Sequence, residues 1–185
     1  MEYIIKDREP KRLFEIFEER SAIPRGSGNE KGIADYICAF AENLGLFYTR
    51  DALHNVFIRK GAGKGFEDRA SVLLQGHTDM VCEKNAGTVH DFEKDPLKLR
   101  VDNGFLSAEG TTLGADDGVA VAMMLALLES SDPMPEIECL FTVDEETGLT
   151  GAFELGEGML KGKYLINLDS EDEGEIFIGC AGGTS

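Results

Sequence analysis

The sequence predicts an α/β layer fold with a mixed sheet, on the basis of two patterns and their order along the chain. Short apolar runs rich in β-branched residues or leucine are typical of buried strands. They occur at 70–74, 136–143 and 164–168. Longer segments with helical periodicity or continuous apolar character indicate helices. They occur at 10–20, 30–44 and 115–129. Strands and helices in this order favour a sheet covered by helices.

The remaining expected elements are short. The helix at 10–20 has Pro10 near its start, where proline is well tolerated. The glycine-rich segment 61–65 resembles a phosphate-binding loop. It lacks the Gly-Lys-Ser/Thr ending and a following helix, so we interpret it as a hairpin or surface turn. Further strands are expected at 46–50, 55–60 and 176–178, and a short helix at 151–155.

Two features stand out in the middle of the chain. The polar stretch 78–96 is longer than an ordinary connection, which indicates a functional segment. After it, the runs 97–101 and 105–108 alternate around an Asp-Asn-Gly turn, which predicts a β-hairpin.

Composition and charge exclude several classes of protein. A hydrophobic content of 42% and 185 residues are sufficient for one folded domain with a core. The net charge of −17 argues against nucleic acids and anionic membranes as partners. The N-terminus has no signal-peptide pattern, and no apolar run is long enough for a bilayer. The four cysteines have neither metal-site nor disulfide spacing, so we expect a cytoplasmic protein with reduced thiols, most of them buried in the core.

The buried run at 70–74 leads into Gly76-His77-Thr78-Asp79. In extended chain the side chains of His77 and Asp79 point the same way, so the carboxylate can contact the imidazole. A metal-bound histidine uses such a carboxylate on its other ring nitrogen. For this one motif taken alone, a structural histidine with its hydrogen bonds satisfied at a strand end is the better explanation, and the acidic clusters downstream favour the metal site.

Two acidic pairs follow downstream. Asp116 and Asp117 directly precede the apolar helix, where the helix dipole keeps a carboxylate ionised. One aspartate would suffice as an N-cap, which leaves the other free to bridge cations. Glu145 and Glu146 follow the strand 136–143 and diverge, so one can bind a metal while the other acts as general base. A solvated acidic turn is the alternative for this pair.

A further acid, Asp169, ends the run 164–168. The acids after it resemble a calcium loop, but position 12 is Cys180 rather than glutamate, so this interpretation fails. Together, the strand and helix ends carry one imidazole and several carboxylates, a set that suits two ions such as Zn²⁺ or Mn²⁺. A serine nucleophile is a weaker alternative, because Ser27 does not lie in a Gly-x-Ser-x-Gly turn.

Four of these motifs, in this order, resemble the co-catalytic zinc peptidases of family M20, and among them the aminoacyl-histidine dipeptidases. They are Gly-His-Thr-Asp-Met-Val at 76–81, Gly-Ala-Asp-Asp-Gly at 114–118, Asp-Glu-Glu-Thr-Gly at 144–148 and Asn-Leu-Asp at 167–169. The segments 23–30 and 179–183 also resemble that subgroup. The resemblance covers essentially the whole chain and implies a three-layer α/β/α zinc-peptidase catalytic domain with a mixed sheet.

The resemblance also implies a role for each motif residue. Two divalent metal ions, zinc with manganese or cobalt as alternatives, would hold a hydroxide that attacks the carbonyl of an Xaa-His dipeptide. The metal ligands would be His77, Asp116, Glu146 and Asp169, with Asp116 shared by both ions. Asp79 would orient His77, and Glu145 would be the general base.

The sequence departs from the family in one respect. The family needs a further histidine and an inserted lid domain, and neither His54 nor His90 lies in a matching motif. We therefore expect residues 1–185 to be the amino-terminal portion of a truncated catalytic domain, with a homo-oligomer possible for the full-length protein. Two alternatives stay open: a related amide hydrolase, such as a deacetylase or aminoacylase, and a catalytically incomplete metal-binding fragment.

Overall fold

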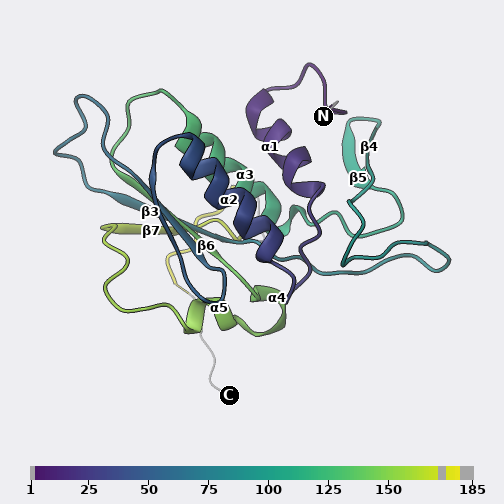
Figure 1. Ribbon diagram of the computed structural model, residues 1–185. Helices are drawn as coiled ribbons and strands as arrows, with labels where there is room; N and C mark the ends of the chain where they lie inside the picture. The colour runs from purple at the N-terminus through teal and green to yellow at the C-terminus, as the bar shows by residue number, and fades with distance from the viewer. Residues whose placement is uncertain (1–2, 171–173, 180–185) are drawn as a thin grey trace.

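Five strands form a mixed sheet in the order β1-β2-β6-β3-β7 in the computed structural model, which describes residues 3–170 and 174–179 (Figure 1). The strands are β1 (Phe47–Arg50), β2 (Val56–Lys60), β3 (Val72–His77), β6 (Ile137–Thr142) and β7 (Tyr164–Asn167). β3 lies parallel to both β6 and β7, with Leu74 opposite Cys139 and Ile166. β2 pairs antiparallel with β1 and with β6. The predicted α/β fold with a mixed sheet is confirmed.

Three helices cover one face of this sheet: α1 (Lys11–Ser21), α2 (Lys31–Asn43) and α3 (Ala115–Glu129) (Figure 1). Their apolar faces meet alternate strand residues in one core. Its fully buried members include Phe17, Ile37, Leu125, Ile58 and Phe141. Each such side chain stabilises the fold by about 1.5–3 kcal/mol relative to its exposed state. None of the helices in the described residues is long and apolar enough to cross a membrane.

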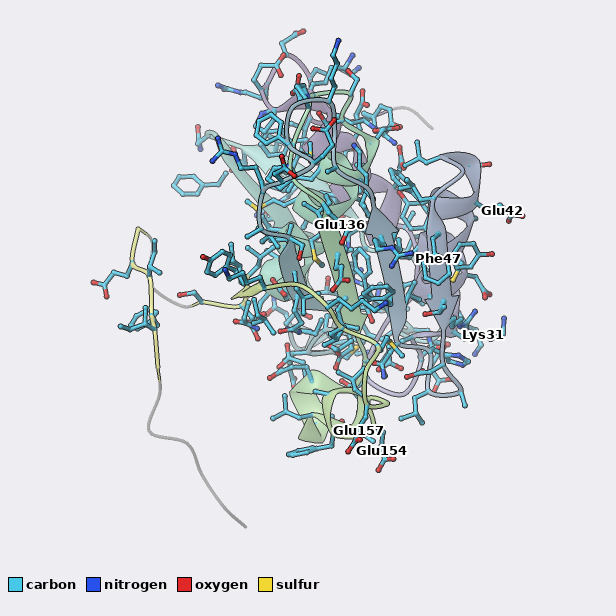
Figure 2. All side chains as sticks on the ribbon, turned by 90° about the vertical axis from the view of Figure 1, so that its left-hand side faces the viewer. Lys31, Glu42, Phe47, Glu136, Glu154 and Glu157 are labelled. Carbon is cyan, nitrogen blue, oxygen red and sulfur yellow. The ribbon has the colours of Figure 1, made fainter. Side chains whose placement is uncertain are left out.

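The opposite face of the sheet carries a smaller apolar cluster. Phe57, Leu73 and Leu140 point to this side and pack against Leu155, Met159 and Leu160. The last three belong to the segment that follows the short helix α5 (Thr150–Phe153). Glu154 and Glu157, labelled in Figure 2, are exposed on the same segment. Short helices and a loop therefore form this layer in the described part of the chain.

The predicted hairpin is confirmed as a separate two-stranded sheet of β4 (Leu99–Asp102) and β5 (Phe105–Ala108). Asn103 and Gly104 form its turn, and both have positive φ, at 50° and 84°. Asparagine and glycine are the residues that tolerate this conformation best, which is why this turn could be recognised from the sequence.

Two expectations differ from the structure, and one open alternative is decided by it. Residues 176–178 form no strand and have no paired neighbour among the described residues, and their side chains are exposed. Of the two interpretations of the segment 61–65, the structure shows the surface turn and not the hairpin, because β2 pairs with β6 rather than with β3. The single helix expected at 151–155 is preceded by a second one, α4 (Glu145–Gly148).

The cysteines only partly follow the expectation of core thiols. Cys38, Cys82 and Cys139 are free, in accord with the expected reduced state, but Cys139 alone among these three is buried. Cys180 lies outside the described residues.

Candidate metal centre

The candidate site lies at the edge of the sheet where the parallel strands end. β3 ends at His77, the turn after β6 carries Glu145 and Glu146, and Asp169 lies just beyond β7. Parallel strands bring their carboxyl ends to one edge, which is where open α/β sheets place their ligands. The side chains that the sequence marked at separate strand ends are therefore neighbours in space.

His77 is held by two carboxylates, one on each ring nitrogen. Its Nδ1 lies 3.2 Å from Oδ1 of Asp79, and its Nε2 lies 3.0 Å from Oδ1 of Asp116. His77 is 1% exposed and Asp79 is 0% exposed. The expected contact between the imidazole and the carboxylate two residues on is confirmed. A carboxylate oxygen at each ring nitrogen favours the protonated imidazole.

Asp116 and Asp117 have different surroundings at the start of α3. The Asp116 side chain is 73% exposed and faces His77. Asp117 is buried, and its Oδ2 accepts a hydrogen bond from the backbone N–H of His77 at 3.1 Å. Asp116 and Asp117 both have non-helical backbone angles, so the regular part of α3 begins after them. The side-chain contact of Asp117 fixes the end of β3.

Gly76 permits the close approach of α3 to β3. A Cβ at this position would lie 2.4 Å from Oδ2 of Asp117 and 3.2 Å from Cβ of Ala120. A side chain would thus displace the carboxylate that holds His77. The glycine in the motif before His77 has a packing reason that the sequence alone did not reveal.

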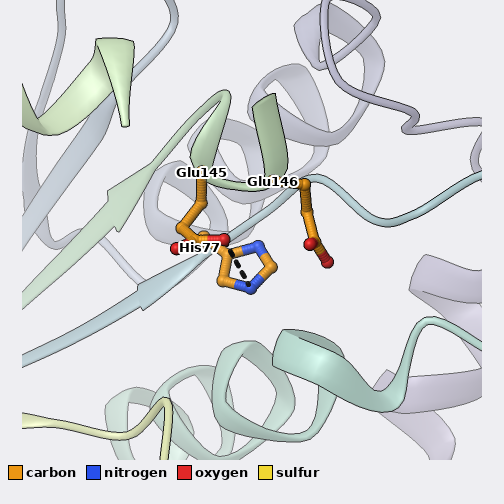
Figure 3. A group of neighbouring side chains, drawn as sticks. All are labelled: His77, Glu145 and Glu146. Atoms are coloured by element: carbon orange, nitrogen blue, oxygen red, sulfur yellow. Dashed lines mark ion pairs between the residues drawn. The ribbon is translucent and has the colours of Figure 1, made fainter. Parts of the chain in front are cut away.

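Glu145 and Glu146 project from α4 on either side of the imidazole (Figure 3). Oε2 of Glu145 lies 4.0 Å from Nε2 of His77. The backbone N–H groups of Glu145 and Glu146 donate to the two carboxylate oxygens of Asp79, at 3.1 and 3.2 Å. Asp79 therefore contacts both the histidine and the helical turn that carries the two glutamates.

Two groups of side chains place ligand atoms within 4.8 Å of one another. One group is His77, Asp116 and Asp169, and the other is His77, Glu145 and Glu146. Each combines an imidazole with two carboxylates, a donor set found around catalytic zinc. The first group is the set expected for one ion. The pairing of Asp116 with Glu146 expected for a second ion does not form such a group among the described residues.

The charges at this edge repel one another. Burial disfavours a charged His77, but the hydrogen bonds and charges of Asp79 and Asp116 outweigh burial and raise its pKa to about 9. Burial raises the pKa of Asp117 to about 7. Burial also raises the pKa values of Glu145 and Glu146, and neighbouring carboxylates add to both shifts. Clustered carboxylates of this kind are stabilised in their charged form by a nearby cation.

Two buried arginines hold the entry to α3, and the sequence analysis missed both. Arg20 and Arg25 are 0% and 1% exposed, and each donates to the carbonyl oxygen of Gly114 at 3.2 Å. Gly114 has a φ of 63°, and a Cβ there would lie 2.4 Å from Nη2 of Arg25. Arginine near a helix end is ordinarily exposed, so no pattern in the sequence distinguishes these two.

The other histidines lie away from the site. Nδ1 of His54 is 2.7 Å from Nη2 of Arg50. His90 packs against Phe92, with 4.5 Å between ring centroids. Neither histidine belongs to a ligand group within the part of the chain that the structure describes.

Cavities flank the cluster on two sides. One of about 530 Å³ is lined by Glu146 and Thr147 and by residues of the loop 26–29. Another of about 660 Å³ is lined by Asp116, Asp117 and Asp169. Volumes of this size are typical of sites for small molecules.

The chain is similar in sequence and structure to known peptidases. The chain is 46% identical over 175 residues to the cytosol non-specific dipeptidase of Escherichia coli K12, covering 94% of this chain and 36% of that protein. It matches the crystal structure of aminoacylhistidine dipeptidase from Vibrio alginolyticus with a TM-score of 0.91 and 45% identity, covering 94% and 36% of the two chains. A tripeptidase from Staphylococcus aureus matches with a TM-score of 0.73 and 26% identity, covering 88% and 44%.

The chain spans about a third of the length of the two dipeptidases. Residues 73–180 match Peptidase family M20/M25/M40, which is more than half of the chain and includes every candidate ligand. The chain therefore belongs to Peptidase family M20/M25/M40.

Proposed function

We propose that residues 1–185 contribute metal ligands and the general base to the catalytic domain of a metal-dependent dipeptidase. The observation that carries this proposal is the ligand group of His77, Asp116 and Asp169 at the sheet edge, with Glu145 and Glu146 beside the same histidine. Similarity to two dipeptidases supports the reaction class. Because the chain spans about a third of each relative, the activity is proposed for a protein that also contains the remaining part.

The geometry supports the ligands proposed for one ion, and the resemblance to the family suggests those proposed for a second. His77, Asp116 and Asp169 would hold one divalent ion, most simply zinc, with manganese or cobalt as alternatives. Asp116 would also contact a second ion, together with Glu146. When bound, such ions polarise the peptide carbonyl and lower the pKa of water. Asp79 would keep the proton of His77 on Nδ1 and so leave Nε2 for the metal.

Glu145 is the proposed general base. Its side chain is 30% exposed, so solvent and substrate can reach it. Burial raises its pKa, which brings the carboxyl group closer to the pH at which a base both accepts and returns a proton. The 4.0 Å between Glu145 and His77 is too long for a direct hydrogen bond, so Glu145 remains available to a water molecule.

The proposed substrate is a small dipeptide of the Xaa-His type. One relative is named for aminoacylhistidine and the other for non-specific dipeptides, so the breadth of the specificity is part of the test. We propose a cytoplasmic location, in line with the name of the E. coli protein. No membrane or nucleic-acid partner is proposed, and a homo-oligomer remains a prediction for the longer protein.

Metal titration tests the ligand assignment. Isothermal titration of the metal-free chain with Zn²⁺ should show one tight site, because the second ion keeps only Asp116 and Glu146 as ligands. Asp169→Asn should weaken that site, and Asp132→Asn, an exposed aspartate far from the site in sequence, is the control. Absence of tight binding would contradict the metal proposal. Two tight sites would contradict the assignment of ligands.

A chimera tests the activity. This chain would replace the matched 175 residues of the E. coli dipeptidase. The chimera should hydrolyse Xaa-His dipeptides when zinc is supplied, whereas the 185-residue chain alone should hydrolyse them negligibly. Preference for N-acyl amino acids would instead favour a deacetylase or aminoacylase. A folded, zinc-loaded chimera without turnover would favour a metal-binding fragment.

A further inference from the structure

The loop 26–30 lies against the candidate metal centre although none of its residues belongs to a ligand group. Gly26 forms a parallel bridge with Met80, which places the loop beside the segment after β3. The hydroxyl of Ser27 donates to Oδ2 of Asp79 at 2.7 Å, across 52 positions of sequence. This loop belongs to the segment 23–30 that the sequence singled out, yet the proposed mechanism assigns it no role.

Asp79 receives four hydrogen bonds, two on each oxygen. Oδ1 accepts from Nδ1 of His77 and from the backbone N–H of Glu145. Oδ2 accepts from the hydroxyl of Ser27 and from the backbone N–H of Glu146. An ionised carboxylate offers about four lone-pair sites, so all of its accepting capacity is used. Of the four donors, the Ser27 hydroxyl alone comes from outside the proposed catalytic machinery.

We propose that Ser27 is a positioning residue that acts through Asp79 on His77 and on the turn that carries Glu145 and Glu146. A carboxylate fixed at both oxygens cannot rotate, so it holds the imidazole ring of His77 and the first turn of α4 in place. Without the Ser27 hydroxyl, Oδ2 keeps a single donor and the carboxylate gains freedom to turn. The imidazole of His77 and the turn that carries both glutamates then become less fixed together, because Asp79 is their common hydrogen-bond acceptor.

A second contact from the same loop supports this role. Oε1 of Glu30 accepts a hydrogen bond from the backbone N–H of Asp144 at 3.0 Å, and Glu30 is 5% exposed. Asp144 precedes α4 with a φ of 55°, in the left-handed region that non-glycine residues rarely adopt. Such a conformation persists when its surroundings hold it. The loop therefore holds the start of α4 through two contacts. Glu30 contacts Asp144 directly, and Ser27 contacts the next two residues through Asp79.

The inference deepens the proposed function, but its main test needs no metal and no substrate. In the metal-free 185-residue chain, the amide hydrogens of Glu145 and Glu146 are protected by Asp79. In Ser27→Ala, we expect these two amides to exchange roughly tenfold faster than in the wild type, with core amides unchanged.

Two further variants separate positioning from general stability. Ser27→Thr keeps the hydroxyl, and Ser27 lines the cavity of about 530 Å³, so the added methyl group has room. This variant should restore the wild-type exchange rates. Ser107→Ala is the control, because the Ser107 hydroxyl accepts only from Arg100 in the separate hairpin among the described contacts. It should leave the exchange rates of the two amides unchanged.

Uniformly faster exchange of all amides in Ser27→Ala, or no change at Glu145 and Glu146, would overturn the inference. Failure of Ser27→Thr to restore the rates would also overturn it. Zn²⁺ titration is the last arm, with roughly tenfold weaker binding expected in Ser27→Ala. A wild-type chain that binds no zinc but shows the exchange pattern would count against the proposed function while supporting the role of Ser27.

Discussion

Replacing Asp79 by asparagine tests the network on which the candidate centre depends. The substitution keeps the shape of the side chain but converts one carboxylate oxygen into an NH₂ donor and removes the negative charge. Asp79 is 0% exposed and accepts from four donors, so no solvent is available to compensate for a lost contact. The variant therefore changes the electrostatics and the hydrogen bonding of a single buried position.

The size of the effect follows from which oxygen remains. If the amide oxygen takes the place of Oδ1, His77 and Glu145 keep their acceptor. The NH₂ group then faces Ser27, whose hydroxyl can turn and accept, and the N–H of Glu146, which cannot. One partly buried donor is thus left unpaired, at a cost of about 1–3 kcal/mol in the free energy of unfolding. In the opposite orientation the NH₂ group faces His77 and Glu145, so two donors lose their acceptor and the free energy of unfolding falls further.

Two measurements check this reasoning. Urea unfolding of the metal-free chain should show the loss of about 1–3 kcal/mol without global unfolding. Zn²⁺ titration should show affinity reduced by about 10–100-fold, because the amide no longer raises the basicity of His77. Asp68→Asn, at an exposed position in the loop before β3, is the matched control and should change neither quantity. Wild-type zinc affinity in Asp79→Asn would refute the proposed role.

Three further predictions concern the base, the packing and the pH dependence. Glu145→Gln in the chimera should retain zinc while turnover falls by about two to four orders of magnitude; release of zinc would show that Glu145 rather than Glu146 is the ligand. Gly76→Ala should lower the free energy of unfolding by about 1–3 kcal/mol, because its Cβ would lie 2.4 Å from Oδ2 of Asp117. Gly61→Ala, with nothing within 4 Å of the added Cβ, is the control, and equal stability of the two variants would contradict the packing argument. Burial alone would raise the pKa of Glu19, but hydrogen bonds from Tyr3, Tyr36 and Arg12 lower it below the ordinary value of 4.5. A lowered pKa in the folded state stabilises the protein above the unfolded pKa, and this contribution is lost as the pH falls through the folded pKa. Urea unfolding from about pH 6 to about pH 3 should therefore show a shallower loss of stability in Glu19→Gln than in the wild type; identical slopes would refute this assignment.

The sheet was predictable because its signals are local. The runs that became β3, β6 and β7 are apolar, short and bounded by polar residues, so they could be recognised one at a time. The run at 176–178 has the same local pattern but no strand beside it among the described residues. A strand needs a partner to satisfy its backbone, and apolar pattern alone cannot supply that information. The pairing of β2 with β6 was likewise out of reach, because it joins residues far apart in the chain.

In the candidate centre, too, the residues with a local signal were predictable and those held by long-range contacts were not. His77, Glu145, Glu146 and Asp169 follow strands directly, and parallel strands must end at a common edge, so a pattern in the sequence predicts that they meet. The residues that hold them in place carry no such mark. Asp117 contacts the backbone of His77 across 40 positions of sequence, and its neighbour Asp116 has the same residue type and almost the same place in the motif. Spacing cannot tell these two aspartates apart.

The supporting residues come from the segments that pack around the sheet edge, and this has a physical reason. A ligand at a strand end is fixed along the strand by the ladder of hydrogen bonds, but its side chain can still rotate. The donors that stop this rotation must approach from another direction. Arg20 and Arg25 do so for the entry to α3 through Gly114, and Ser27 does so for Asp79. All three lie before residue 30, on α1 and the loop that follows it, so the first segment of the chain determines how rigidly the later motifs are held. Variants in that segment should consequently alter zinc affinity and amide exchange at the centre without removing a single ligand.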